Sequence, residues 1–167
     1  MAKVVDQFRA VVSGLRRSAR SRSMPRRAVV DAAPRALVVM GAGPGRDALQ
    51  GVFRDAGWKL VVADTPSSAF ASQQQEPLPI ILYERELTER GWRQVVSVFS
   101  RQSPRPCVVL LSRRSDKNLW DELVRYGGFD VLRTPIDRDA VIRTVRAGWS
   151  IWRNQQNPRP LAVVSRR

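Results

Sequence analysis

The chain of 167 residues is 43% hydrophobic and fits one domain with flanking segments, and it lacks the run of about 18 apolar residues that predicts a membrane span. The absence of histidine removes the commonest general base and metal ligand, and a single cysteine, Cys107, excludes an intrachain disulfide. The formal net charge of +14 suggests an anionic partner, but residues 1–34 and 154–167 carry +6 and +3 of it, so the central part is only weakly basic.

We expect residues 1–34 to form a basic amphipathic extension followed by a linker. Their apolar residues recur at helical spacing: Val4, Val5, Phe8, Val11, Val12 and Leu15. Such a helix can pack on its own domain or lie on an anionic surface. A nucleic-acid or anionic-surface binder is therefore one alternative function, and it would use Arg16, Arg17, Arg20, Arg26 and Arg27.

Residues 35–153 alternate apolar runs with helical patterns, and residues 154–167 form a C-terminal tail. We expect strands at 36–40, 58–63, 79–83, 107–112 and 129–133. We expect helices at 44–56, from 65 to about 70, at 88–102, after Asp116 and after Asp137, with residues 73–77 as a loop. The pattern predicts an α/β fold with three layers, a doubly wound five-stranded parallel sheet in the flavodoxin-like order 2-1-3-4-5.

A glycine-rich turn follows the first predicted strand and opens the first helix, where backbone N–H groups can receive an anion. The turn resembles the loop of Rossmann-like S-adenosylmethionine methyltransferases, and Asp64 stands where those enzymes place a ribose-binding acid. Two departures are Val39, where an acid is usual, and Arg46, where the dinucleotide pattern has its third glycine. A methyltransferase-like or nucleotide-binding fold is the second alternative, and it would use Gly41, Gly43, Gly45 and Asp64.

The third predicted strand, Ile80-Ile81-Leu82-Tyr83, runs into Glu84, the fourth ends in Leu110-Leu111-Ser112, and the fifth is followed by Thr134-Pro135. This order resembles the receiver domain of bacterial two-component response regulators, which act in phosphorelays. The resemblance implies that Glu84 stands at the phosphoacceptor position. It also implies an acid-pair position at Gly41 and Ala42 and switch positions at Ser112, Val131, Thr134 and Pro135.

Receiver chemistry requires two acids that hold Mg²⁺, an aspartate nucleophile and a lysine that offsets the phosphoryl charge. Here the resemblance places glycine and alanine, glutamate, and threonine at those positions, which implies a degenerate receiver that is not an enzyme and needs no metal or cofactor. Glu84 either imitates the phosphorylated state by accepting a hydrogen bond from Ser112 or Thr134, or is a solvated acid without a switching role.

The resemblance further implies cytoplasmic signalling through protein partners, independent of phosphorylation. The face made by the fourth helix, fifth strand and last helix is the candidate docking or homodimer surface, and exposed tryptophans there would suit a binding hot spot. The candidates are Trp120, Trp149 and Trp152. The other interpretation is ordinary core anchoring, and Trp120 in particular fits a semi-buried position on its helix.

Overall fold

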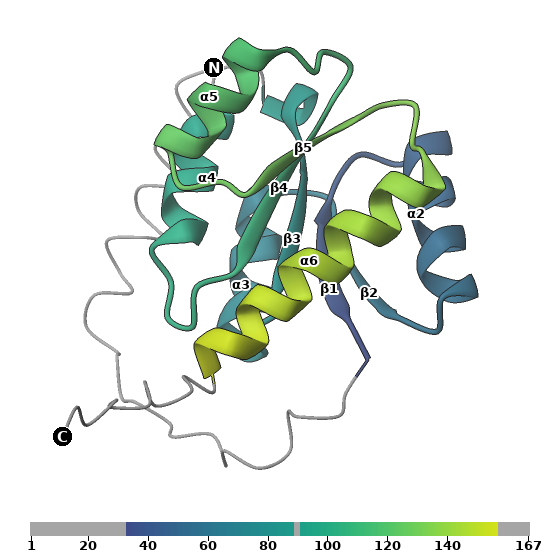
Figure 1. Cartoon of the computed structure of the whole chain (residues 1–167), viewed down its shortest axis with the longest axis horizontal. Coiled ribbons are helices and arrows are strands. Elements are labelled where there is room, and N and C mark those ends of the chain that lie inside the picture. The colour runs from purple at the N-terminus through teal and green to yellow at the C-terminus, as the bar shows by residue number, and fades with distance from the viewer. Residues whose placement is uncertain (1–32, 89–90, 157–167) are drawn as a thin grey trace, which may run out of the picture.

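A computed structural model describes residues 33–88 and 91–156 of the chain, and its centre is a five-stranded parallel sheet (Figure 1). The strand order is β2-β1-β3-β4-β5, which confirms the predicted topology. The strands are β1 (Arg35–Val39), β2 (Lys59–Ala63), β3 (Ile80–Glu84), β4 (Cys107–Ser112) and β5 (Asp130–Arg133). Strands β1, β3 and β4 are almost continuously buried because helices cover both faces of the sheet.

Five helices of the described residues form the two outer layers, α2 and α6 on one face and α3, α4 and α5 on the other (Figure 1). Their bounds are α2 (Pro44–Asp55), α3 (Pro66–Gln75), α4 (Trp92–Ser100), α5 (Lys117–Arg125) and α6 (Arg138–Gln156). Alternate residues of each strand enter opposite layers: Leu37 and Val39 pack under α3, whereas Ala36 and Val38 pack under α2 and α6. No helix in residues 33–88 and 91–156 is long and apolar enough to cross a membrane.

Three helices start where the sequence predicted, and each start is capped by a side chain. Thr65 and Ser68 form a reciprocal capping box at α3. At α5 the Asp116 carboxylate accepts a hydrogen bond of 2.9 Å from the Leu119 N–H, and at α6 the Asp137 carboxylate accepts one of 2.6 Å from the Ala140 N–H. These local contacts explain why the helix starts were readable from sequence.

The predicted bounds of two helices are wrong. Helix α3 continues to Gln75, through residues expected to form a loop, because the buried Gln73 side chain both donates to and accepts from the Leu78 backbone, at 2.9 and 3.0 Å. The helix expected at 88–102 is replaced by a 3₁₀ turn, Arg85–Thr88, and the shorter α4. The last helix, for which the sequence pattern set no end, runs to Gln156.

The tryptophans are arranged differently from the predicted docking face. Trp149 and Trp152 are buried, 7% and 4% exposed, and their rings stack with centroids 5.6 Å apart in the core between α6 and the sheet. They anchor α6 and cannot form an exposed hot spot. Trp120 is 45% exposed instead of semi-buried, because it lies on the outer side of α5.

The predictions about the two flanks are untested. Residues 1–32, which include the arginines of the proposed nucleic-acid surface, and residues 157–167 lie outside the described residues.

Candidate functional site

The candidate site lies at the carboxyl edge of the sheet, where successive parallel strands end side by side. The strand register places Glu84 beside Leu111, and Ser112 beside Arg133. The β1–α2 turn begins at the same edge, because Val39 pairs with Tyr83. The structure therefore brings the sequence-predicted positions of β1, β3, β4 and β5 to one edge, as the carboxyl ends of a parallel sheet require.

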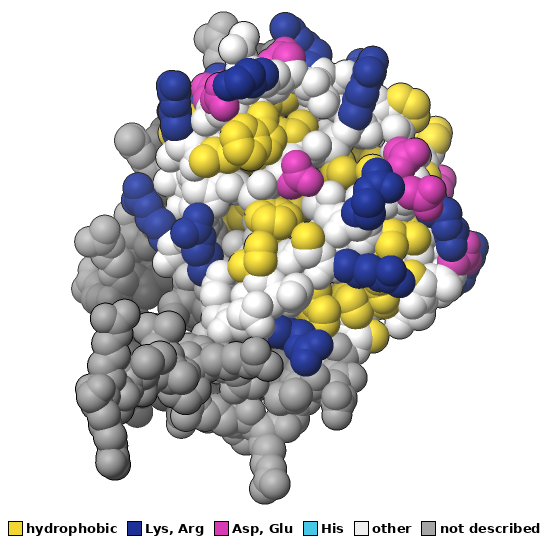
Figure 2. Space-filling model, in the orientation of Figure 1, with side chains coloured by type: hydrophobic (Ala, Val, Ile, Leu, Met, Phe, Trp, Pro, Cys, Tyr) yellow, Lys and Arg dark blue, Asp and Glu magenta, His cyan; other side chains and the backbone are white. Residues whose placement is uncertain are grey.

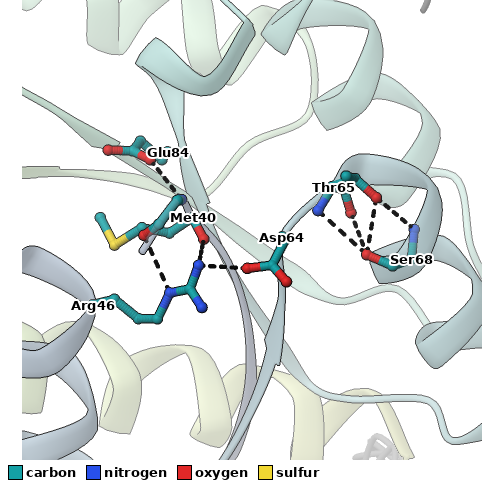
Figure 3. A network of polar contacts seen from close by, with 7 residues as sticks. Met40, Arg46, Asp64, Thr65, Ser68 and Glu84 are labelled. Carbon is teal, nitrogen blue, oxygen red and sulfur yellow. Dashed lines mark hydrogen bonds and ion pairs between the residues drawn. The ribbon is translucent and has the colours of Figure 1, made fainter. Parts of the chain in front are cut away.

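Glu84 is hydrogen-bonded to the glycine turn. Its Oε2 accepts a hydrogen bond of 3.0 Å from the Gly41 N–H, which joins the end of β3 to the turn after β1 (Figure 3). Among the described residues, neither Ser112 nor Thr134 donates to Glu84, so the structure lacks the hydrogen bond that the phosphoryl-imitating alternative requires. Gly41 itself has no side chain to offer a metal, and the adjacent Ala42 offers none with an oxygen atom.

Arg46 closes the glycine turn from within. Its guanidinium donates from Nη2 to the Met40 carbonyl at 2.6 Å and from Nε to the Gly41 carbonyl at 3.1 Å. The same Nη2 lies 2.5 Å from Asp64 Oδ1, and Figure 3 shows the guanidinium between the turn and that carboxylate. The Arg46 side chain is only 15% exposed, so it fills the space at this edge.

This arrangement does not favour a methyltransferase-like or nucleotide-binding function. Asp64, the candidate ribose-binding acid, is already paired with Arg46. Gly43 does precede helix α2 with a φ of 151°, a backbone conformation suited to glycine, but the inner side of its turn faces this chain's own guanidinium.

Ser112 contacts a different acid from the one expected. Its hydroxyl donates to Glu86 Oε1 at 3.4 Å, which is long for such a bond, and it accepts a bond of 3.2 Å from the Arg114 N–H. The Arg113 N–H donates to the same Glu86 oxygen at 3.1 Å, and the Arg85 guanidinium lies 4.0 Å from it. Glu86 was missed in the sequence, although its place two residues after the end of β3 marks it as an acid near this edge.

The remaining switch positions contribute backbone and packing. The Thr134 N–H donates to the Ser112 carbonyl at 2.9 Å, and the Thr134–Pro135 peptide bond is cis. Val131 is partly buried and packs against the core beneath α5. Thr134 therefore ties β5 to β4 through its backbone, and no charged group stands at its position.

The carboxylates of this edge do not converge on one point. Within residues 33–88 and 91–156, no three acidic or sulfur-bearing side chains form a group that could hold a metal ion. Glu84, Asp64 and Glu86 are each bonded to a different partner, namely Gly41, Arg46 and Arg113.

Comparison with known proteins supports the fold. No protein-family model matches the chain, and no curated protein matches it. Among solved structures, a response regulator from Thermotoga maritima superposes with a TM-score of 0.65 at 20% identity, covering 71% of this chain and 99% of that one. The magnesium-bound receiver domain of the sensor histidine kinase PA1611 from Pseudomonas aeruginosa gives 0.61 at 16% identity, covering 71% and 99%.

A third similar structure is the beryllofluoride-activated receiver-domain dimer of NtrC4, with a TM-score of 0.64, 15% identity, and 71% and 98% of the two chains covered. These likenesses show that the chain has the receiver-type flavodoxin-like fold. At such identities they show the fold alone, and the residues of the edge must indicate what the chain does.

Proposed function

We propose that this chain is a degenerate receiver-like signalling domain that acts through protein–protein contacts without being phosphorylated. One observation carries the proposal: the polar side chains at the carboxyl edge of the receiver-type sheet are already bonded to backbone groups of the chain itself. Glu84 holds Gly41, Arg46 holds the same turn from its other side, and Glu86 holds the end of β4. The proposal assigns no catalytic step to the chain, and a cytoplasmic location stays a prediction.

The electrostatics of the edge support the loss of phosphorylation. A divalent cation needs several oxygen ligands, and the acid-pair position supplies none from Gly41 and Ala42. The guanidinium of Arg46 places a fixed positive charge at the same turn, which repels a second cation. Glu84 carries its carboxylate one methylene further from the backbone than aspartate would, and Thr134 has no charge to offset a phosphoryl group.

A partner surface is available beside this edge, on α5, β5 and α6. All four exposed large hydrophobic residues of the described chain lie on or next to these two helices: Trp120, Val124, Tyr126 and Ile151. Figure 2 shows hydrophobic patches on the side of the molecule that carries α5 and α6, with Lys and Arg side chains and fewer Asp and Glu side chains around them. An exposed tryptophan with apolar neighbours and a charged rim suits a protein contact. We place the docking surface on α5 around Trp120 and Val124, since Trp149 and Trp152 are buried.

A homodimer through the last helix has less support. Burial of the two tryptophans leaves Ile151 as the exposed large apolar residue of α6. The outer side of this helix is basic, with Arg143 and Arg153 exposed and, within residues 33–88 and 91–156, no acidic side chain paired with either. Two such helices would place like charges against each other.

An amide NMR titration of the full chain with Mg²⁺ and beryllofluoride tests the proposal, with a phosphorylatable response regulator as the positive control. We expect no saturable shift at Glu84, Ser112 or Thr134 under conditions in which the control responds. Specific, saturable shifts at these residues would show that the edge still binds a metal and a phosphoryl analogue, and the proposal would be wrong.

A matched surface experiment tests the partner face. Once a binding protein is identified, Trp120→Ala should weaken its affinity by at least tenfold, whereas Arg54→Ala, an exposed change on α2, should change it less than twofold. Equal effects of the two substitutions would remove α5 from the interface.

A further inference from the structure

The end of β4 presents two hydrogen-bond donors to a single acceptor position. The Ser112 hydroxyl and the Arg113 N–H both point to Glu86 Oε1, at 3.4 and 3.1 Å. The Arg85 guanidinium, 4.0 Å from that oxygen, adds positive charge nearby. A hydroxyl, a backbone N–H and a nearby cation make a small site suited to one oxygen of an anion.

We propose that this position is an oxyanion site filled from within the chain by Glu86, and that Glu86, not Glu84, holds the signalling surface in one conformation. The inference deepens the proposed function and rests on it for the signalling consequence. Glu86 is a positioning residue, because it acts on the surface through the turn that it holds. The ligand class of the site is a carboxylate or another small oxyanion.

The bonds of Glu86 reach the docking surface in a few steps along the backbone. Glu86 fixes the Arg113 N–H, and the Ser112 hydroxyl, which donates to Glu86, accepts from the Arg114 N–H. Both ends of the turn that enters α5 are therefore anchored: Arg113 and Arg114 here, and Asp116 by its capping bond to Leu119. Trp120 lies in the first turn of the helix that this turn positions.

Glu84 offers no comparable route to the surface. Its bond to the Gly41 N–H ties β3 to the β1–α2 turn, on the side of the sheet edge away from α5. Replacing Glu84 should therefore leave the docking surface unchanged, whereas replacing Glu86 should alter it, so Glu84→Ala is a matched control for Glu86→Ala.

The test uses ¹⁵N-labelled full-length chain carrying Glu86→Ala, with Glu84→Ala as the matched control and Ser112→Ala as a second variant. Loss of the Glu86 carboxylate should speed amide exchange at Arg113 by about tenfold and shift the Trp120 indole signal. Glu84→Ala should move the Gly41 amide and leave Arg113 and Trp120 unchanged. Ser112→Ala should speed exchange at Arg114 while Arg113 stays protected.

Rescue by an added anion tests the site itself. Sodium acetate should slow Arg113 exchange in the Glu86→Ala variant toward the parent rate, whereas sodium chloride at the same ionic strength and acetate added to the parent chain should have no effect. Exchange at Arg113 within twofold of the parent in Glu86→Ala, an equal change in Glu84→Ala, or no rescue by acetate would overturn the inference.

These outcomes are separable from a failure of the proposed function. Binding of Mg²⁺ and beryllofluoride to the parent chain would refute phosphorylation-independent action but would leave the measured role of Glu86 in place. A silent titration together with an unchanged Glu86→Ala variant would do the reverse.

Discussion

Replacing Arg46 with methionine tests whether one guanidinium holds the glycine turn closed. Methionine keeps the apolar length of the side chain and removes its hydrogen bonds, so packing changes little. The bonds lost are those to the Met40 carbonyl at 2.6 Å and to the Gly41 carbonyl at 3.1 Å, together with the ion pair to Asp64. The variant therefore isolates the polar role of Arg46.

The size of the expected loss in unfolding free energy follows from how far the Arg46 side chain is exposed to water. The Arg46 side chain is 15% exposed, and hydrogen bonds to a charged donor are worth about 1.5–3 kcal/mol each, less where water can replace the donor. Two such bonds, partly compensated by water at the open edge, give a loss of about 2–4 kcal/mol. Asp64 is 74% exposed, so its share of the ion pair is below about 1 kcal/mol.

Urea unfolding of the full chain, followed by tryptophan fluorescence, measures the loss, and Asp64→Asn is the matched control. At a denaturant slope of about 2 kcal/mol per molar, Arg46→Met should lower the midpoint by about 1–2 M, and Asp64→Asn by less than about 0.5 M. A loss below about 0.5 kcal/mol for Arg46→Met, or an equal loss for Asp64→Asn, would refute the view that the guanidinium works through the two carbonyls.

Three further predictions concern packing, reactivity and pH. Trp152→Ala, which empties a buried site beneath α6, should destabilise the fold by about 3–5 kcal/mol, whereas Trp120→Ala on the surface should cost less than about 1 kcal/mol. Similar urea midpoints for the two variants would contradict the burial of Trp152. Burial raises the pKa of the Cys107 thiol to about 11, so at pH 8 its thiolate fraction is about a hundredfold below that of an ordinary thiol. A coloured disulfide reagent should therefore label Cys107 only after the chain unfolds. Rapid labelling of the native chain would contradict this prediction. The hydrogen bond from Arg93 lowers the pKa of Glu122 below its ordinary 4.5. This carboxylate therefore stabilises the fold fully above pH 4.5 and loses its contribution as the pH falls through the lower pKa of the folded state. Glu122→Gln should flatten the acid side of the curve of stability against pH, and an unchanged acid side would disprove the pairing.

The strands and their order were predictable because the signals are local and repeated. Each buried strand is a short apolar run, and a helix follows every strand, which leaves few topologies for a parallel sheet. Helix starts at Thr65, Asp116 and Asp137 were readable for the same reason, since a capping side chain bonds to a backbone N–H within three residues.

The misplaced features depend on contacts that no local pattern encodes. Gln73 is polar and suggests a loop, yet it is buried because the Leu78 backbone, five residues on, satisfies both ends of its amide. Trp149 and Trp152 lie in the apolar stripe of α6, but helical spacing alone does not tell which residues of a wide stripe face the sheet and which face water.

The candidate site shows the same division. The edge and its positions were predictable from where the strands end, whereas the partners of Glu84, Arg46 and Glu86 were not. Each of these side chains bonds a backbone group from another strand end or turn, and the choice of acceptor depends on the register and on the path of the turns.

The position of α6 in the chain has a consequence for synthesis on the ribosome. The strands β1, β2 and β3 are complete once residue 84 has been made, about halfway along the chain. Part of the face formed by Ala36, Val38, Ile80 and Leu82 is covered by α6, the last described helix. Until residues 138–156 have been made, a nascent chain therefore exposes apolar strand surface that is open to non-native association. Chains stalled before α6 should be the ones that chaperones hold, and completion of this helix should be the step that releases them.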